Sequence, residues 1–403
     1  MTKNCFYCFA LGAVVLSMVA FTACSNTSKK VQQDGSKTEL PANAVEIDYQ
    51  HHIYCDVLLR DSIPARMIFD TGCSNILLDS TFYADTFGKS GALRKAMVGG
   101  AGNGKELVNL DTNKWSYSIG EESKTEDMAM VVNLRRIVGD RADGMFGMVF
   151  MQGKRVEFNY ADGWMRFLPA EEKIGDDFTR IQCKWLDKEM RIVIPLSLQL
   201  DNGYVFEGNF LIDTGMAGTV SLNSTTAQNL QKQQHLANAR CMIYAVGGIG
   251  GSREDYVFKS PQISLGNNVI KDVRVVWAGN NQGAMADMRY DGLIGNELLD
   301  RFDVIFDFVN CAVYLRPNRN FNRAEPNDFG IAMTPKVDHW IVNGLLEGGN
   351  AEQAGLRRGD RIETINGIRA NDSKISDLYP LPDKITLTIR RGGDYVDVTI
   401  SKE

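Results

Sequence analysis

Histidine is scarce in this sequence, and that scarcity limits the chemistry the chain can perform. Only four histidines occur among 403 residues, and none has metal-ligand spacing with another histidine or with a cysteine. The sequence therefore predicts no metal site, and the adjacent pair His51 and His52 is interpreted as solvated surface. No cofactor is predicted either, because Glu106 stands where a phosphate-binding loop beginning at Gly99 would need serine or threonine.

Basic residues form no stripe or cluster along the chain. Lys and Arg number 44 against 50 Asp and Glu, and the formal net charge is −6. A nucleic-acid partner is therefore not predicted. The Gly-x-Ser-x-Gly nucleophile elbow is also missing, and no sequence cue pairs Cys73 with a histidine, so neither an elbow-type serine hydrolase nor a thiol protease is indicated.

The cysteines do not form a disulfide framework. Once the first 24 residues are set aside, five cysteines remain, widely spread and odd in number. One bridge is compatible with an oxidising compartment, and its pairing stays open. The five are Cys55, Cys73, Cys183, Cys241 and Cys311.

The N-terminus carries the one long apolar run and resembles a bacterial lipoprotein signal. Residues 10–23 are largely apolar, shorter than the ~20 residues that span a bilayer, and a small residue precedes Cys24. The resemblance implies a signal peptide at 1–24, lipidation of Cys24 and a flexible polar tether at 25–44. An ordinary secretory signal is the alternative. Because Ser25 rather than Asp follows, we predict a cell-envelope location, anchored by lipid alone to the outer membrane and facing the periplasm.

The body of the chain contains four short motifs twice, in the same order. Asp213 follows Asp70 by 143 residues, and the other three motifs recur 148 residues apart. Each copy has short apolar runs without helical periodicity, which is typical of strands. We therefore predict a mainly β protein with two similar β-lobes, 45–170 and 190–317, and a connector at 171–189. The repeated pairs are 68–72 with 211–215, 98–102 with 246–250, 143–147 with 291–295, and 156–160 with 304–308.

In each copy an apolar run ends at Asp-Thr-Gly, at Asp70 and at Asp213. Glycine permits a tight turn that brings backbone N–H groups to the carboxylate, and the threonine hydroxyl can bond to nearby backbone. Two such loops meeting across a pseudo-twofold axis would place two carboxyls face to face, where one keeps its proton. Such a pair can take a proton from water and give one to a peptide carbonyl.

The doubled loop resembles the pepsin–retropepsin family of aspartic proteases. The resemblance implies acid-protease β-lobes and an aspartic endopeptidase with Asp70 and Asp213 as catalytic residues. It also implies support of the pair by Thr71, Gly72, Thr214 and Gly215. Glycine-rich tips in both halves resemble the two flaps of a retropepsin-like enzyme: Gly99, Gly100, Gly102, Gly247, Gly248 and Gly250. Cys73 and Met216 depart from the family, which usually has Ser or Ala at these positions.

After a linker at 318–327, residues 328–403 resemble a bacterial PDZ domain. The resemblance rests on Ala-Gly-Leu-x-x-Gly-Asp at 354–360 and Ile-Asn-Gly at 365–367. It implies a small β-barrel with helices that captures the carboxylate of C-terminal peptides through a loop. That loop is Phe329, Gly330, Ile331 and Ala332. A degenerate PDZ domain that only packs against the rest of the chain is the alternative.

Together these features predict an aspartic endopeptidase, with peptides or unfolded proteins as substrates and a PDZ domain that recruits or gates them. The alternative is a catalytically inert, lipid-anchored peptide-binding scaffold.

Overall fold

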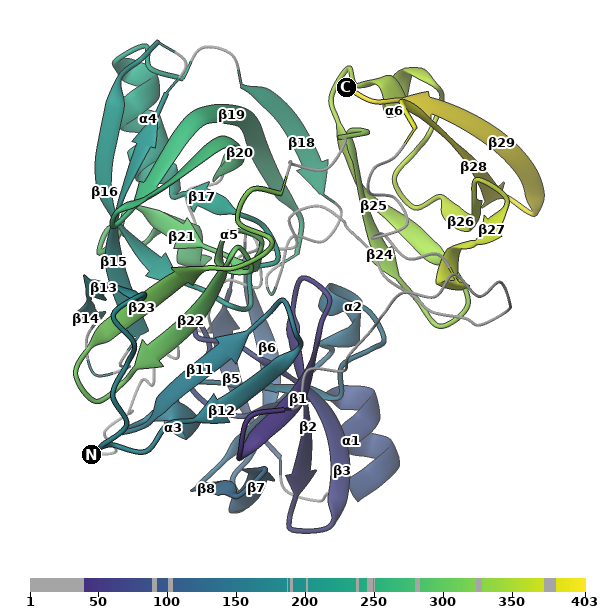
Figure 1. Cartoon of the computed structure of the whole chain (residues 1–403). Coiled ribbons are helices and arrows are strands. Elements are labelled where there is room, and N and C mark those ends of the chain that lie inside the picture. Colours follow the sequence, from purple (N-terminus) through teal and green to yellow (C-terminus); the bar gives the residue numbers. More distant parts are fainter. Residues whose placement is uncertain are drawn as a thin grey trace, which may run out of the picture.

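The chain is mainly β, as the sequence predicts (Figure 1). The computed structural model describes residues 40–403 except 89–92, 101–103, 187, 189–190, 201, 237–238, 245–248, 250, 280–282, 324–327 and 373–381. The predicted signal peptide, Cys24 and most of the tether lie outside this range. Among the described residues, no helix has the length and apolar character needed to cross a membrane.

The first sheet is built mostly from the N-terminal part of the chain. It has 15 strands, and β13, β22 and β23 join it from further along the sequence. The hairpin β5–β6 lies at one end of the sheet order. Its strands are β1 (Ala44–Tyr49), β2 (Ile53–Leu59), β3 (Ile63–Phe69), β4 (Leu77–Asp79), β5 (Arg94–Gly99), β6 (Lys105–Asp111), β7 (Trp115–Ile119), β8 (Glu122–Glu126), β9 (Ala129–Val132), β10 (Gly144–Phe146), β11 (Arg155–Asn159), β12 (Trp164–Phe167), β13 (Thr179–Gln182), β22 (Phe302–Asp307) and β23 (Ala312–Pro317).

The second sheet continues from the middle of the chain into its C-terminal part. It has 14 strands, and the order β19-β18-β25-β26 carries it across from one part to the other. Its strands are β14 (Lys184–Leu186), β15 (Arg191–Gln199), β16 (Val205–Ile212), β17 (Val220–Leu222), β18 (Arg240–Tyr244), β19 (Arg253–Leu265), β20 (Asn268–Ala278), β21 (Gly292–Ile294), β24 (Ile331–Pro335), β25 (Trp340–Leu346), β26 (Arg361–Ile365), β27 (Ile368–Arg369), β28 (Lys384–Arg391) and β29 (Asp394–Ser401).

The helices are short, and α1 and α4 begin at side-chain caps. The Asp79 carboxylate accepts from the backbone N–H groups of Thr81 and Phe82 at the start of α1, and the Asn223 side chain accepts from Thr226 at the start of α4. The helices are α1 (Ser80–Phe87), α2 (Arg135–Val138), α3 (Met148–Met151), α4 (Ser224–Lys232), α5 (Asn296–Leu299) and α6 (Asn350–Gln353), with 3₁₀ turns η2 (Gly283–Ala286) and η3 (Ala370–Asp372).

One pairing pattern occurs in both sheets. β3 runs parallel to β10, β10 antiparallel to β4, and β4 parallel to β9. In the same way β16 runs parallel to β21, β21 antiparallel to β17, and β17 parallel to β20. Asp143 and Asp291 precede β10 and β21, and each carboxylate accepts from a backbone N–H, that of Arg66 or Asn209. The two Asp-Thr-Gly loops therefore leave equivalent positions in the two patterns.

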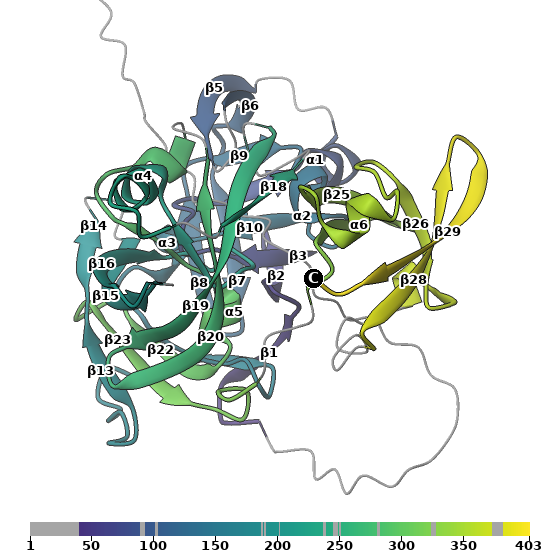
Figure 2. The same ribbon diagram turned by 90° about the horizontal axis from the view of Figure 1, so that it is seen from above.

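Several buried apolar clusters support these sheets, and the two largest are separate from each other. The larger includes Phe69, Phe158, Phe210 and Phe306, and so joins strands from both sheets. Strands β24–β29 enclose a second core that includes Trp340, Leu387 and Ile400. These strands form a distinct unit beside the larger body in two views (Figures 1 and 2).

The segment predicted as a charged connector, 171–189, contains two strands. β13 pairs with β23, and β14 pairs with β15. Charged residues alternate there with Ile181 and Leu186, both of which are buried, so the charge content concealed the strand pattern. All five described cysteines are free.

Candidate functional site

Two carboxyl groups lie at the ends of equivalent strands. Asp70 follows β3 and Asp213 follows β16, and they are 1% and 0% exposed. Their backbone N–H groups donate to Phe146 at 3.0 Å and to Ile294 at 2.9 Å. The chain then turns, because Cys73 and Met216 donate back to the carbonyls of Asp70 and Asp213. Backbone bonds thus fix both residues before their side chains are considered.

Thr71 and Thr214 bind the two loops to each other. Each backbone N–H donates to the other threonine's hydroxyl, at 2.9 and 3.0 Å. The Thr71 hydroxyl donates to Ile212 O at 2.8 Å, and the Thr214 hydroxyl donates to Phe69 O at 2.9 Å. Four buried hydrogen bonds therefore join loops that lie far apart in the sequence.

The glycines bring backbone against the carboxyls. Gly72 N–H donates to Asp70 Oδ1 at 2.7 Å, and Gly215 N–H donates to Asp213 Oδ1 at 3.0 Å. A Cβ on Gly215 would lie 2.5 Å from Asp70 Oδ2, so a larger residue does not fit there. The two carboxyls hydrogen-bond to each other, while their Oδ2 atoms find no N–H or O–H donor elsewhere in the described residues.

Burial raises the pKa of both carboxyls. The pKa of Asp213 lies well above its ordinary value, because the Asp70 charge and the shared hydrogen bond add to the effect of burial. Backbone donors at Gly72 and Cys73 partly offset the rise at Asp70. The two carboxyls therefore titrate as a coupled pair that keeps one proton between them. A pair in this state offers one proton acceptor and one donor a few ångströms apart.

Sequence reasoning missed His52, which lies against this site. His52 is buried rather than solvated, and its Nε2–H donates to Gly215 O at 3.1 Å. Burial lowers the pKa of His52 to about 4, so the ring is neutral near neutral pH. The sequence signal was its position directly before Ile53, the first residue of a largely buried strand. Arg191 was also missed; it is 1% exposed, and its charge lowers the pKa of Asp213.

The predicted flap glycines are described only in part. Gly99 ends β5, and Gly100 contacts Ile249, since a Cβ on Gly100 would lie 2.8 Å from Ile249 Cβ. Gly100 O also accepts from Ala284 N–H at 3.0 Å. Gly100, directly after β5, thus contacts residues of the second half. Gly102, Gly247, Gly248 and Gly250 lie outside the described residues.

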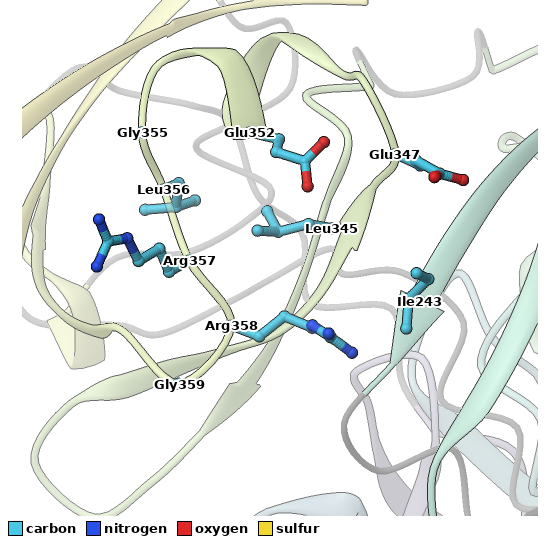
Figure 3. A pocket seen from close by; sticks show the side chains of 9 residues that line it. All are labelled: Ile243, Leu345, Glu347, Glu352, Gly355, Leu356, Arg357, Arg358 and Gly359. Carbon is cyan, nitrogen blue, oxygen red and sulfur yellow. The ribbon is translucent and has the colours of Figure 1, made fainter.

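The predicted peptide-binding loop has the expected local form. Gly330 has φ +68°, its N–H donates to Asp328 Oδ1 at 2.8 Å, and β24 begins at Ile331. Phe329 and Ala332 are buried. Nearby, a groove of about 730 Å³ separates β18 from the loop after α6 (Figure 3). It is lined by Ile243, Leu345, Glu347, Glu352, Gly355, Leu356, Arg357, Arg358 and Gly359.

Within the described part of the chain, no group of three or more His, Cys, Asp or Glu side chains is placed to hold a metal ion.

Comparison with known proteins identifies the C-terminal unit. Residues 341–391 match the family model of the PDZ domain. The chain contains a PDZ domain. It is also 33% identical over 93 residues to proteins named probable CtpA-like serine protease, from Staphylococcus aureus strains COL, MSSA476 and MRSA252. Each match covers 21% of this chain and 19% of the relative, so the chain spans about a fifth of the length of the relatives it matches.

These comparisons correct the predicted family and mechanism. The sequence motifs predicted a retropepsin-like aspartyl protease with an Asp dyad, or else an inert scaffold; the named relatives are serine proteases instead. The aspartic class assignment is therefore not retained. The physical reason is that the resemblance rested on short loops. A repeated Asp-Thr-Gly turn explains why two carboxyls meet, but it does not by itself identify the group that attacks a substrate.

Proposed function

We propose that this chain is a peptidase whose PDZ domain binds peptides or protein substrates. The observation that carries the proposal is the similarity to probable CtpA-like serine proteases, together with the PDZ match at 341–391. A PDZ domain binds an extended peptide by adding it as a strand to a sheet edge. The proposed peptide-binding loop is Phe329, Gly330, Ile331 and Ala332.

The relatives' name favours a serine nucleophile. Such a nucleophile needs a base within hydrogen-bond reach, and no described serine hydroxyl bonds to a histidine or lysine. Ser74 and Ser221 have buried hydroxyl oxygens with no hydrogen-bond partner in the described residues, so neither is paired with the base that such a nucleophile needs. Ser74 lies four residues after Asp70 in the sequence.

We further infer that Asp70 and Asp213 are the polar centre of the functional site. Their burial, their shared proton and the four threonine hydrogen bonds support this. Perturbed carboxyls of this kind cluster at functional sites. On the same reasoning, Thr71, Gly72, Thr214 and Gly215 hold the pair in place, and the glycine-rich tips border it. The matched strand pairing supports an origin of the body from two duplicated lobes related by a pseudo-twofold axis.

The experiment is casein cleavage by the purified full-length chain between pH 3 and pH 9, with and without a fluorophosphonate. We expect cleavage that rises with enzyme concentration. A serine nucleophile predicts covalent labelling and loss of activity, and Ser74→Ala and Ser221→Ala then identify the labelled residue. Absence of cleavage at every pH, in a protein with a normal circular dichroism spectrum, would contradict the peptidase proposal.

The predicted location remains a proposal as well. Lipidation of Cys24 would hold the chain at the cell envelope. Mass spectrometry of the mature N-terminus tests it, since lipidation predicts a diacylglyceryl cysteine and a protein that begins at residue 24.

A further inference from the structure

Cys183 and Cys311 face each other at the end of two neighbouring strands of the first sheet. The antiparallel pairing of β13 with β23 ends with Gln182 opposite Ala312, so the same register places Cys183 opposite Cys311. The backbone continues this register by one step, because Cys183 N–H donates to Cys311 O at 3.1 Å. The Gln182 side chain donates to the same carbonyl at 3.0 Å. The two cysteines, 128 residues apart in the sequence, are thus held side by side.

Both cysteine side chains point to the same face of the sheet. Side chains alternate along a strand, and Ile181 and Val313, each two residues from one of the cysteines, are buried in the larger core. Cys183 and Cys311 belong to that core as well and are 5% and 8% exposed. Both are free thiols that hydrogen-bond to each other, and burial raises the pKa of each. We call these two residues the facing pair.

The spacing of opposed strand residues suits a disulfide bond. Directly opposed residues of antiparallel strands have Cα atoms ~4.5–5.5 Å apart, and disulfides join Cα atoms ~4.4–6.8 Å apart. A bond within the facing pair therefore requires the two side chains to rotate and leaves the strands where they are.

The other described cysteines have different neighbours. The Cys55 thiol donates to Met165 Sδ at 3.8 Å, and the Cys73 thiol donates to a backbone carbonyl at 3.1 Å. Cys241 lies opposite Tyr256 in the pairing of β18 with β19. These three cysteines are internal controls for any chemistry of the facing pair.

The turn that carries Cys311 is fixed by its own hydrogen bonds. Asp307 Oδ1 accepts from the N–H groups of Val309 and Asn310 at 3.0 and 2.8 Å, and Asp307 Oδ2 accepts from the Asn310 side chain at 2.9 Å. Cys311 has φ +50°, which is uncommon for a residue other than glycine, so the turn imposes this conformation. Because these bonds already fix the backbone, little conformational freedom is lost when the two thiols join.

Cys183 lies where the chain passes from the first sheet to the second. β13 is the last strand in the order of the first sheet, and β14, which begins at Lys184, pairs with β15 of the second sheet (Figure 1). An edge strand is paired along one side only, so the position of β13 depends on its pairing with β23. A covalent bond from Cys183 to Cys311 would fix this crossover to the β22–β23 hairpin.

We propose that Cys183 and Cys311 are a redox site that closes to a disulfide bond by exchange with a disulfide-bearing oxidant. One cysteine thiolate attacks the oxidant's disulfide and releases the first thiolate, and the other attacks the resulting mixed disulfide and releases the second. The two protons lost by the cysteines pass to the released thiolates, so the oxidant is reduced to two thiols. Disulfides form and persist in the periplasm, the compartment predicted for this chain. The inference is independent of the proposed peptidase function.

The test compares the purified full-length chain in oxidised glutathione and in dithiothreitol. The chain is refolded from urea in each buffer, so that the oxidant reaches both thiols before they are buried. The protein is then denatured and alkylated with N-ethylmaleimide, and its tryptic peptides are mapped by mass spectrometry without reduction. In the oxidised sample we expect the peptides of Cys183 and Cys311 joined, with the loss of two hydrogen atoms, and Cys55, Cys73 and Cys241 not joined to either.

The bond should also change the melting temperature. It closes a loop of more than one hundred residues, and this constraint on the unfolded chain should raise the melting temperature of the oxidised protein by about 5–10 °C over the reduced protein. Cys183→Ser and Cys311→Ser should each abolish this difference, whereas Cys241→Ser, the matched control, should keep it. Each variant is compared with itself in two redox states, so a loss of stability from the substitution alone does not imitate the result.

The proposal is overturned if Cys183 and Cys311 are both alkylated after oxidation, or if either is joined mainly to another cysteine. It is also overturned if Cys183→Ser keeps the full rise in melting temperature, or if the oxidised and reduced parent melt at the same temperature. None of these measurements uses peptide cleavage, so a chain that cleaves nothing but joins Cys183 to Cys311 loses the proposed function and keeps the redox site.

Discussion

At the scale of single residues, the site depends on a few buried hydrogen bonds. The threonine hydroxyls of Thr71 and Thr214 each accept one bond and donate another across the loops. A buried donor or acceptor that loses its partner costs more than the bond itself contributes. The two threonines are buried, so water cannot replace any of these hydrogen bonds when one is lost.

Thr214→Val should reveal this dependence in the stability of the protein. Valine keeps the shape but leaves Thr71 N–H and Phe69 O without partners, so we expect a loss of about 2–4 kcal/mol in the free energy of unfolding. Urea denaturation measures it. Thr399→Val is the control, because the hydroxyl of exposed Thr399 bonds, among the described residues, to the hydroxyl of half-buried Thr386, and its loss should cost under about 0.5 kcal/mol. Equal losses in both variants would contradict the interlocking role.

The raised pKa of Asp213 predicts how stability changes with pH. In the folded protein Asp213 keeps its proton where the unfolded chain has released it, so this residue favours folding at low pH and loses that contribution as pH rises through the folded-state pKa. Asp213→Asn cannot ionise. Its melting temperature should equal the parent's near pH 3 and exceed it near pH 7.

Thermal melts at several pH values test this, with Asp394→Asn, an exposed carboxyl, as the control. A melting-temperature difference between Asp213→Asn and the parent that stays constant from pH 3 to pH 7 would show that folding does not raise the pKa of Asp213.

At the scale of elements, each Asp-Thr-Gly loop is wedged against a neighbouring strand-to-helix turn. Gly147 and Gly295 lead into α3 and α5. The N–H groups of Met148 and Asn296, which follow these glycines, donate to the carbonyls of Cys73 and Met216 in the two loops, both at 2.9 Å. A Cβ on Gly147 would lie 1.9 Å from Cys73 O. The loop conformation is thus set by packing from outside as well as by its own residues.

Gly147→Ala should therefore displace the Asp70 loop. Because the obstacle is backbone, it cannot rotate away, and we expect a loss of at least about 2–3 kcal/mol in the free energy of unfolding. Gly99→Ala is the matched control, since no atom lies within 4 Å of a Cβ there. Chemical denaturation of the two variants measures the free energy of unfolding of each. A Gly147→Ala variant as stable as Gly99→Ala would show that the loop adapts to the added methyl group.

The local sequence pattern explains how much of the fold and of the candidate site could be predicted. The apolar run and the Asp-Thr-Gly turn predicted each strand and loop, because these features are short-range. The meeting of Asp70 and Asp213, 143 residues apart, was predicted only from the repetition of that pattern. The burial of His52 and the strands within 171–189 were not predicted. These segments contain many polar and charged residues, and which of their positions are buried depends on residues far away in the sequence. The Asp-Thr-Gly motif also predicted the wrong protease class, because the sequence of a turn determines backbone geometry and not the type of reaction.

At the scale of the whole molecule, the PDZ domain is both separate and attached. It has its own core, yet its strand β25 continues a sheet that begins in the body. No local sequence signal indicates the β18–β25 pairing, because the two strands are about one hundred residues apart and each reads as an ordinary strand. Attachment through a shared sheet predicts cooperative unfolding.

Differential scanning calorimetry should therefore show one unfolding transition for the parent protein. Gly344→Val, which breaks the shared edge, should separate a PDZ transition from that of the body. Thr399→Val should keep the single transition. Two transitions in the parent would show that the junction does not couple the units.

The central claim, that the chain is a peptidase whose site is centred on the buried carboxyl pair, is tested most directly by comparing casein cleavage by the parent and by Asp213→Asn at equal folded concentration. We predict that the parent cleaves casein and that the variant is slower by about 100-fold or more, because it replaces one of the two buried carboxyls at the centre of the proposed site. Cleavage by the variant at the parent's rate would contradict the account.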